Sequence, residues 1–477
     1  MQAKPAKGVE MRVMSMPVKV VLMAGGNGTR FWPNSTPELP KQFLTMECTG
    51  SLLQNAYARA RTLVASHNIY VSTHVSYAEL VLRQLPELPE ENLILEFEGR
   101  DTAPALGLAA VVLGRTDPNT VMVALPSDHM VGDEGAFTNT LQAAVEAAGS
   151  LEALVTVGIQ PERPETGYGY IQLGESVASY RGFQLHRVER FREKPTEPVA
   201  RQYIEAGNCL WNAGMFVWRV GVFRAALARH LPELEAVLEQ LEELSDQELR
   251  AEAQREVFAL APRISVDYGL LEKSSQVYSV LASFPWDDLG TWPALTRLRQ
   301  PDLNGNITRG PVVLSDSKNT FVEANERVVA AIGVSNVIVV DGENGVLVCS
   351  VEHAHDVKKI AGVVRERNYR QAPGVPFVRV GGFEQTQSGE MHTWVQTPDY
   401  TGRFLSINAG KRLCYDRHAG YRSWFVQGGL GRVLVEGDPR DVAKGDVITI
   451  QPGRSCELLA LTTLAIFEIA PGSGERE

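Results

Sequence analysis

Five short apolar runs lie between residues 18 and 159, each about as long as one buried strand. They are VKVVLMA (18–24), NIYVST (68–73), NLILEFE (92–98), TVMVALP (120–126) and ALVTVGI (153–159). Most of their residues are apolar, which is typical of strands that helices cover on both faces. Helical patterns separate some of these runs, over residues 102–115 and 136–150. The alternation predicts an α/β fold with a mostly parallel sheet up to about residue 300.

Later segments follow other patterns. The acidic stretch 231–257 is typical of a helix that faces solvent, because its charges keep one face hydrated. From about residue 305, short strands alternate with turn sequences such as SDSKN and DGENG, which predicts stacked hairpins or a rough β-solenoid over residues 305–370. The sequence QAPGVPF (371–377) predicts a linker, and glycine turns beyond it predict a small β-barrel or sandwich over residues 378–477.

Length, charge and cysteine content exclude several classes of protein. A chain of 477 residues exceeds what one hydrophobic core usually serves, so two or three domains are expected. The formal net charge of −11 argues against a nucleic-acid or membrane surface, and no apolar stretch is long enough to span a bilayer. Five dispersed cysteines without a CxxC pair favour a reduced, cytoplasmic compartment. Residues 1–17 lack the apolar core of a signal peptide and are expected to form a disordered tail.

A glycine-rich turn follows the first apolar run, in VLMAGGNGTRFWP (21–33). Such a turn at the carboxyl end of a buried strand can present backbone N–H groups to a phosphate. It is not a Walker A loop, because no Lys-Ser/Thr pair follows the last glycine, and it lacks the third glycine of a dinucleotide fingerprint. A tight turn without a ligand is the alternative. Arg30 and Lys41 favour the phosphate, because two cations suit a triphosphate that leaves as pyrophosphate.

Two aspartates follow strand-like runs. Asp128 comes shortly after the run 120–126, and Asp288 follows YSVLASF in FPWDDLGTW. Carboxylates at this edge of an α/β sheet suit Mg²⁺, which takes one or two carboxylates together with water and phosphate oxygens. Each aspartate could instead cap a helix or form a turn. The two can share an ion only if the fold brings them together.

Three further segments suit a sugar phosphate. In FREKP, Glu193 can accept sugar hydroxyls and Lys194 can hold a phosphate, with a surface ion pair as the alternative. In LWNAGMFVW, a buried Asn212 would need hydrogen-bond partners, which either sugar hydroxyls or the backbone would supply. The glycines and tyrosines of PETGYGYIQLG (164–174) suit either a substrate-lining turn or a hairpin.

Nine motifs occur in one order: AGGNGTRFWP, PKQF, GRDTAPA, LPSDH, PETGYGYI, FREKP, LWNAGMF, ISVDYGLLEK and WDDLGTW. Together they resemble bacterial mannose-1-phosphate guanylyltransferases of the long type, whose C-terminal region is similar to mannose-6-phosphate isomerase. The resemblance covers residues 18–365 well and the remainder loosely. It implies a Rossmann-like nucleotidyltransferase domain over residues 18–304, then a β-rich segment and a cupin-like barrel. It also implies that GTP and mannose 1-phosphate are converted to GDP-mannose and pyrophosphate.

The resemblance also implies roles for individual residues. The nucleotide would contact Gly25, Gly26, Gly28, Thr29, Arg30, Gly99, Arg100, Asp101 and Thr102, and Asp101 stands where the family usually has Asn. The sugar would contact Gly167, Tyr168, Glu193 and Asn212. The residues expected to carry catalysis are Arg30, Lys41, Asp128, Lys194 and Asp288. Of these, Lys41 would bind the departing pyrophosphate and Lys194 the sugar phosphate, while the two aspartates would hold Mg²⁺.

The C-terminal region departs from relatives with isomerase activity, which carry Gln, His, Glu and His as metal ligands. His418 is kept, but Asp416 stands at the Gln position and Cys456 at that of the second His. Arg422 and Ser423 stand where the Glu would precede Trp424. Because Asp, His and Cys can all bind metal, an altered site is one alternative. The expectation is a degenerate barrel with a structural or regulatory role.

The implied chemistry needs no protein nucleophile, because the sugar phosphate can attack the α-phosphorus in line. Catalysis would then be positioning and charge neutralisation. One alternative is another sugar-1-phosphate nucleotidyltransferase that uses glucose 1-phosphate with UTP, dTTP or ATP. Others are a bifunctional enzyme that also isomerises fructose 6-phosphate, and a non-catalytic nucleotide-sugar sensor, which the presence of Asp128, Lys194 and Asp288 disfavours. No nucleic-acid or membrane partner is expected, and a homo-oligomer is left open.

Overall fold

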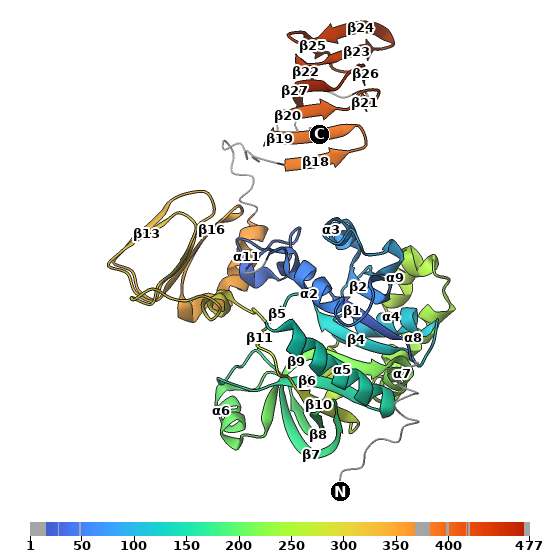
Figure 1. The fold of residues 1–477 in the computed structure, drawn as a ribbon, viewed down its shortest axis with the longest axis vertical. Coiled ribbons are helices and arrows are strands. Elements are labelled where there is room, and N and C mark those ends of the chain that lie inside the picture. The colour runs from blue at the N-terminus through green and yellow to red at the C-terminus, as the bar shows by residue number, and fades with distance from the viewer. Residues whose placement is uncertain are drawn as a thin grey trace. The chain divides into compact units, whose positions relative to one another are not determined.

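The computed structural model describes residues 16–26, 28–46, 49–367, 382–396, 400–415, 417 and 420–471. The chain forms two compact units, residues 1–363 and 364–477, drawn as ribbons in Figure 1. The expected tail at residues 1–17 lies outside the described residues except for its last two, and the expected linker at residues 371–377 lies outside them entirely.

A nine-stranded sheet forms the centre of the first unit. Its strands are β1 (Val18–Met23), β2 (Ile69–His74), β3 (Leu93–Glu96), β4 (Val121–Pro126), β6 (Leu154–Ile159), β7 (Tyr170–Tyr180), β8 (Phe183–Arg192), β9 (Cys209–Arg219) and β10 (Val277–Leu281). The strand order is β3-β2-β1-β4-β9-β6-β10-β8-β7. From β3 to β4 all neighbours are parallel, as the apolar runs predict. Beyond β4 the sheet is mixed, because β9 runs antiparallel to β4 and β6, and β7 to β8.

Helices cover both faces of this sheet (Figure 1). They are α2 (Leu52–Ala60), α3 (Ala78–Gln84), α4 (Thr102–Gly114), α5 (Glu134–Ser150), α6 (Glu197–Ala206), α7 (Val220–His230), α8 (Pro232–Glu243) and α9 (Glu252–Phe258). Helix α10 (Trp292–Thr296) packs in a separate core with Phe321 and Ile338. Because successive side chains of a strand point to opposite faces, β1 contributes side chains to two hydrophobic cores, one on each face of the sheet. Val20 and Leu22 lie in the core that includes α2 and α5, whereas Val21 lies in the core that includes α4 and α8.

The acidic stretch 231–257 forms two helices, α8 and α9, and the acidic residues of α8 lie mainly on an exposed face, as expected. Leu234, Leu238 and Leu241 are completely buried in the core that includes α4. A Cβ on Gly107 of α4 would lie 2.8 Å from Leu238 Cδ1, so the two helices pack closely at this contact. Leucines spaced three and four residues apart therefore anchor one face, and the acidic residues occupy the other.

The β-rich segment that follows is a solenoid closed by one hairpin, which decides between the two expected arrangements. Its strands are β12 (Ile307–Arg309), β13 (Val312–Ser315), β14 (Phe321–Glu323), β15 (Val329–Ile332), β16 (Val337–Gly342) and β17 (Gly345–Ser350). β12, β14 and β16 stack in parallel, as do β13 and β15, whereas β16 and β17 are antiparallel. Phe321 and Ile338 share a core with Trp292, so the solenoid is continuous with the preceding domain. Helix α11 (Val357–Glu366) follows.

The second unit consists of two antiparallel sheets, in agreement with the expected β-barrel. Its strands are β18 (Gly382–Thr386), β19 (Gly389–Gln396), β20 (Tyr400–Ile407), β21 (Arg412–Tyr415), β22 (Arg422–Gly428), β23 (Leu430–Val435), β24 (Asp438–Ala443), β25 (Val447–Ile450), β26 (Cys456–Ala460) and β27 (Leu464–Pro471). The sheets have the orders β18-β19-β20-β27-β22-β25 and β21-β26-β23-β24. Within the described ranges, no helix is long and apolar enough to cross a bilayer.

Candidate active site

The glycine-rich loop leaves β1 at the carboxyl edge of the parallel half of the sheet. Gly25 and Gly26 are exposed, and Asn27 lies outside the described residues. Gly28 has φ +50°, and a Cβ there would lie 2.3 Å from the Cβ of Lys41. Only glycine fits so close an approach, which brings the loop against the segment that carries Lys41. Arg30 follows in a short 3₁₀ turn with its side chain exposed.

Lys41 joins two aspartates that lie far apart in the sequence. Its side chain is 5% exposed. The ammonium Nζ lies 2.8 Å from Asp128 Oδ2 and donates to the main-chain oxygen of Asp288 at 2.6 Å. Asp128 follows β4, and Asp288 follows β11 (Trp286–Asp287), which pairs with β5 (Met130–Val131). The fold therefore brings Asp128 and Asp288 to the two sides of one buried cation.

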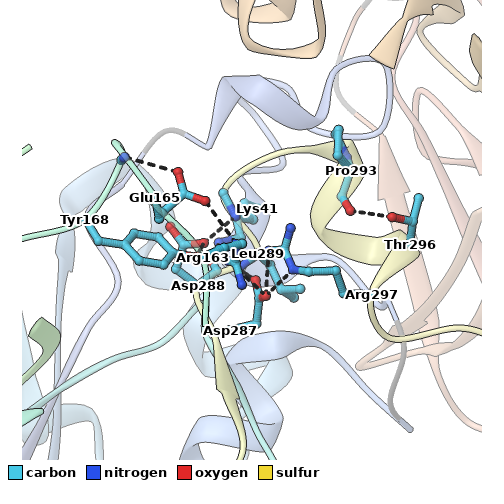
Figure 2. A network of polar contacts seen from close by, with 12 residues as sticks. Lys41, Arg163, Glu165, Tyr168, Asp287, Asp288, Leu289, Pro293, Thr296 and Arg297 are labelled. Atoms are coloured by element: carbon cyan, nitrogen blue, oxygen red, sulfur yellow. Dashed lines mark hydrogen bonds and ion pairs between the residues drawn. The ribbon is translucent and has the colours of Figure 1, made fainter. Parts of the chain in front are cut away.

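The Asp288 carboxylate is held by two donors. Tyr168 OH donates to Oδ1 at 2.6 Å, and the Gly290 amide donates to the same oxygen at 2.8 Å (Figure 2). Burial raises the pKa of Tyr168, and the nearby Asp288 and Asp287 raise it further. The phenol therefore stays protonated and serves as a donor. The tyrosine in PETGYGYIQLG is thus positioned against the carboxylate of WDDLGTW.

The two neighbouring aspartates of WDDLGTW have different partners (Figure 2). Asp287 is buried and accepts from Arg297 Nε at 2.8 Å, while its other oxygen accepts from the Leu289 amide at 2.9 Å. Arg163 Nη2 lies 3.8 Å from the same carboxylate. Asp287 thus fixes the turn that presents Asp288 to Lys41. The sequence motif does not reveal this division of roles.

The charges around Asp128 favour its ionised form. Burial raises the pKa of Asp128, but the Lys41 ammonium and His129 outweigh this effect and hold the pKa below its usual range. Asp288 Oδ2 has no hydrogen-bond donor among the described residues, so it can act as a ligand. Within the same ranges no three His, Cys, Asp or Glu side chains cluster as a metal site. Two carboxylates with hard oxygen donors fit Mg²⁺, which completes its coordination with water and phosphate oxygens.

A second polar cluster contains the expected sugar contacts. Asn212 Oδ1 accepts from Thr156 Oγ1 at 2.8 Å, and its Nδ2 donates to Asp267 Oδ1 at 3.0 Å. Lys194 Nζ donates to Glu193 Oε1, and the Lys194 amide donates to the Tyr168 carbonyl at 3.2 Å. The last bond links this cluster to the residue that holds Asp288.

Asp267 is a residue of this cluster that sequence reasoning missed. It begins the π-helical turn Asp267–Leu271. Its pKa is raised from 3.8 to about 7, by burial first and then by the Glu193 carboxylate. Its motif, ISVDYGLLEK, contributes to the family resemblance, but the spacing of a lone aspartate gives no sign of its contact with Asn212. An acid kept partly protonated in a polar cluster is typical of a binding site.

The expected base and ribose segment begins helix α4. Asp101 has φ +73°, and its side chain caps the helix by accepting from the Thr102 amide at 2.7 Å. Thr102 Oγ1 accepts from the Val266 amide at 2.9 Å, and Arg100 pairs with Glu98 at 3.0 Å. Gly99 and Gly167 lie on turns, with Gly167 donating its amide to Glu165 at 3.2 Å. Asp101 and Thr102 therefore have structural partners, and the segment is fixed to the residues that precede Asp267.

Comparisons with known proteins agree with this geometry. A nucleotidyl transferase family model matches residues 19–305, and a MannoseP isomerase/GMP-like beta-helix domain matches residues 310–364. A mannose-1-phosphate guanylyltransferase from Escherichia coli K12 is 30% identical over 464 residues, which cover 95% of each chain. The chain belongs to the mannose-1-phosphate guanylyltransferase family. The XanB xanthan biosynthesis protein of Xanthomonas campestris is 34% identical over 74% of each chain.

A solved structure from Thermus thermophilus, described as a mannose-1-phosphate geranyltransferase, is 35% identical with a TM-score of 0.66. It covers 73% of this chain and is itself covered completely. A member of the mannose-1-phosphate guanylyltransferase family acts on a nucleoside triphosphate and a sugar phosphate. The site around Lys41 is the candidate active site of this family member.

In the second unit of this family member, cationic and aromatic side chains surround the positions considered above as metal ligands. Arg422 pairs with the completely buried Glu468, and its guanidinium lies 3.7 Å from the centre of the Tyr415 ring. Trp424 Nε1 donates to Glu468 at 2.9 Å. Burial raises the pKa of the Cys456 thiol to about 11, so this side chain is protonated at neutral pH. Asp416 and His418, which were also considered as ligands, lie outside the described residues.

Proposed function

We propose that this protein makes GDP-mannose and pyrophosphate from GTP and mannose 1-phosphate, with Mg²⁺ as the cofactor. The observation that carries the proposal is the position of Lys41, whose Nζ contacts both Asp128 and the main chain of Asp288 next to the glycine-rich loop. The nine ordered motifs and the names of the relatives support the choice of substrates. The proposed compartment is the cytoplasm, where five dispersed cysteines would stay reduced.

The chain's own residues bring two polyanions together. The amides of the glycine-rich loop and the exposed Arg30 receive the triphosphate, and Lys41 neutralises charge that develops on the departing pyrophosphate. Lys194 holds the phosphate of the sugar, whose oxygen attacks the α-phosphorus in line. Mg²⁺, when bound by Asp128 and Asp288, neutralises phosphate charge and orients the reacting oxygens.

The polar cluster around Asn212 positions the sugar ring. Thr156 and Asp267 fix the orientation of the Asn212 amide, and Glu193 offers a carboxylate to hydroxyl groups. Tyr168 connects this cluster with the Asp288 carboxylate. Binding of the sugar and placement of its phosphate are therefore coupled through one side chain.

The test is pyrophosphate release by the full chain over a matrix of substrates. GTP, ATP, UTP and dTTP are each paired with mannose 1-phosphate and glucose 1-phosphate in the presence of Mg²⁺. The expected result is that kcat/KM is highest for GTP with mannose 1-phosphate. A higher value for any glucose 1-phosphate pair would overturn the proposal in favour of a sister enzyme. An assay that follows the conversion of fructose 6-phosphate to mannose 6-phosphate tests the isomerase alternative, and no turnover is expected because Arg422 and Cys456 replace metal ligands.

A further inference from the structure

A cavity of about 330 Å³ lies at the edge of the nine-stranded sheet opposite to the glycine-rich loop. Its lining includes Asn119 just before β4, Glu152 before β6, Gln276 just before β10, and Arg219 at the end of β9. Because β9 runs antiparallel to β4 and β6, these residues all lie at the edge where the parallel strands begin. Asp128 follows the other end of β4. The cavity is therefore separate from the candidate active site.

Basic side chains dominate the charge of this cavity. Arg219, Arg229 and His230 line it, and Glu152 is the one carboxylate among the described residues of the lining. Burial lowers the pKa of His230, and the charges of Arg229 and Lys273 lower it further. Four basic side chains thus lie together in a chain whose formal net charge is −11.

Arg219 has a buried nitrogen that lacks a partner. Its Nε is excluded from solvent and has no hydrogen-bond acceptor within the described ranges. No described carboxylate forms an ion pair with Arg219 or Arg229. By contrast, Arg224 of α7 pairs with Glu235 at 2.7 Å and also with Glu242. A buried donor costs free energy unless an acceptor reaches it, so this cavity is suited to an anionic ligand.

The side chains, and not the start of α7, give the cavity its donors. The first two amides of α7 already donate to the carbonyls of Thr120 and Pro118, at 2.9 Å each. Val222 and Ala226 add apolar groups to the lining, and Gln276 adds a neutral amide. An apolar wall beside cationic donors suits a phosphate that carries a carbon skeleton.

The cavity is also far from the polar cluster proposed to bind the sugar. Asn212 of that cluster and Arg219 are seven positions apart on β9. A strand rises by about 3.3 Å per residue, so the two positions are about 23 Å apart. A phosphate held by Arg219 is therefore not the one that Lys194 is proposed to hold.

We propose that this cavity binds a phosphorylated small molecule, whose phosphate contacts Arg219 and Arg229 and whose carbon skeleton lies against the apolar wall. Guanidinium groups present paired N–H donors that match the oxygens of a phosphate. The volume of about 330 Å³ is within the range of small-molecule sites. The molecule bound there is a ligand that the nucleotidyl transfer does not consume, because the reacting groups lie at the other edge of the sheet.

The test measures binding to the full chain by isothermal titration calorimetry, with inorganic phosphate and glucose 6-phosphate as separate probes. Arg219→Gln and Arg229→Gln each remove one positive charge from the cavity. Arg83→Gln, at an exposed position of α3, is the matched control. Any binding at the glycine-rich loop is common to all these proteins, so a difference between them reports on the cavity.

Glucose 6-phosphate is expected to bind wild-type protein more tightly than inorganic phosphate does. Its Kd should rise at least about tenfold in Arg219→Gln and in Arg229→Gln, the value of one hydrogen bond to a charged group. Arg83→Gln should leave the Kd unchanged. Turnover at saturating substrates should be the same in all four proteins, because the cavity lies apart from the active site.

Equal Kd values in wild-type protein and both cavity variants would overturn the proposal. Tighter binding of inorganic phosphate than of glucose 6-phosphate would overturn the assignment of an organic phosphate. A thermal melt of each variant detects loss of folded protein, and Arg229 is exposed, so Arg229→Gln provides the test even if Arg219→Gln unfolds. Failure of the proposed function would appear in the substrate matrix and would leave these Kd values unaffected.

Discussion

Replacement of Asp267 by Asn is expected to stabilise the first unit at high pH. The Asp267 carboxyl has a pKa raised from 3.8 to about 7, by burial first and then by the Glu193 carboxylate. The folded chain therefore holds a proton that the unfolded chain has already released between these two pH values. The free energy of unfolding falls as the pH rises through this window, and Asn removes that loss.

The magnitude follows from the size of the shift. A displacement of about three pKa units corresponds to about 4 kcal/mol at pH 8, where both states are ionised. At pH 4 the folded carboxyl is protonated and the unfolded one is only partly ionised, and the same expression gives less than about 1 kcal/mol. The Asn212 amide still finds an acceptor, because the new side chain keeps one carbonyl oxygen. The stabilisation at pH 8 should therefore approach this limit.

Thermal unfolding of the full chain, followed at pH 4, 6 and 8, measures the effect. The transition of the first unit should move up by several degrees at pH 8 and by little at pH 4, because one kcal/mol shifts the midpoint of a large domain by about 2 °C. Glu175→Gln, an exposed substitution, provides the matched control and should shift neither. Turnover should fall in Asp267→Asn, because the sugar cluster loses its negative charge.

An equal shift at every pH would refute the reasoning, because a packing effect does not depend on titration. Destabilisation at pH 8 would refute it as well, since it would mean that the Asp267 carboxylate stabilises the fold. Either result would mean that the buried Asp267 carboxyl does not lower the free energy of unfolding at high pH, as expected of a residue kept for binding and not for stability.

Four further predictions concern the site around Lys41. Asp288→Asn should leave far-UV circular dichroism unchanged and lower turnover at saturating Mg²⁺ by at least ~10², the usual value of one electrostatic contact; unchanged turnover would reject the role. Tyr168→Phe removes the bond to Asp288 and should lower kcat about tenfold, with little change in the melting midpoint. Gly28→Ala should cost at least about 1 kcal/mol in urea unfolding, because φ is +50° and Lys41 lies in contact. Removal of divalent ions with EDTA should abolish pyrophosphate release, and Mg²⁺ should restore it.

Much of the fold was predictable because the signals are local. Apolar runs of strand length indicated that β1 to β4 are buried on both faces. The clusters of turn residues indicated the change to a β-rich segment. The direction of β9 was not predictable from its composition, because a buried strand has the same apolar residues whether its neighbours are parallel or antiparallel. The buried leucines of α8 were overlooked because the acidic residues of the same stretch dominate its composition.

The candidate site shows a similar division. Asp128 and Asp288 could be named from strand ends and family motifs, and their joint contact with Lys41 is visible only in three dimensions. The sequence could not assign roles to Asp287 and Asp267. Asp287 stands directly beside Asp288, and Asp267 is a lone carboxylate in a largely apolar motif, so neither has a spacing that indicates its partners.

The sequence by itself determined the types of element, the glycine at position 28, and the presence of acids and cations suited to phosphate chemistry, because these depend on near neighbours. The tertiary structure decided which charges meet. Lys41 Nζ lies 2.8 Å from the Asp128 carboxylate, whereas the buried carboxylate of Glu96, at the end of β3, has no cation among its described contacts. Only the fold decides which of these carboxylates meets a cation. Charge interactions and desolvation act through space over a few ångströms. The separation of two residues in the sequence does not give the distance between their charged groups in the folded chain.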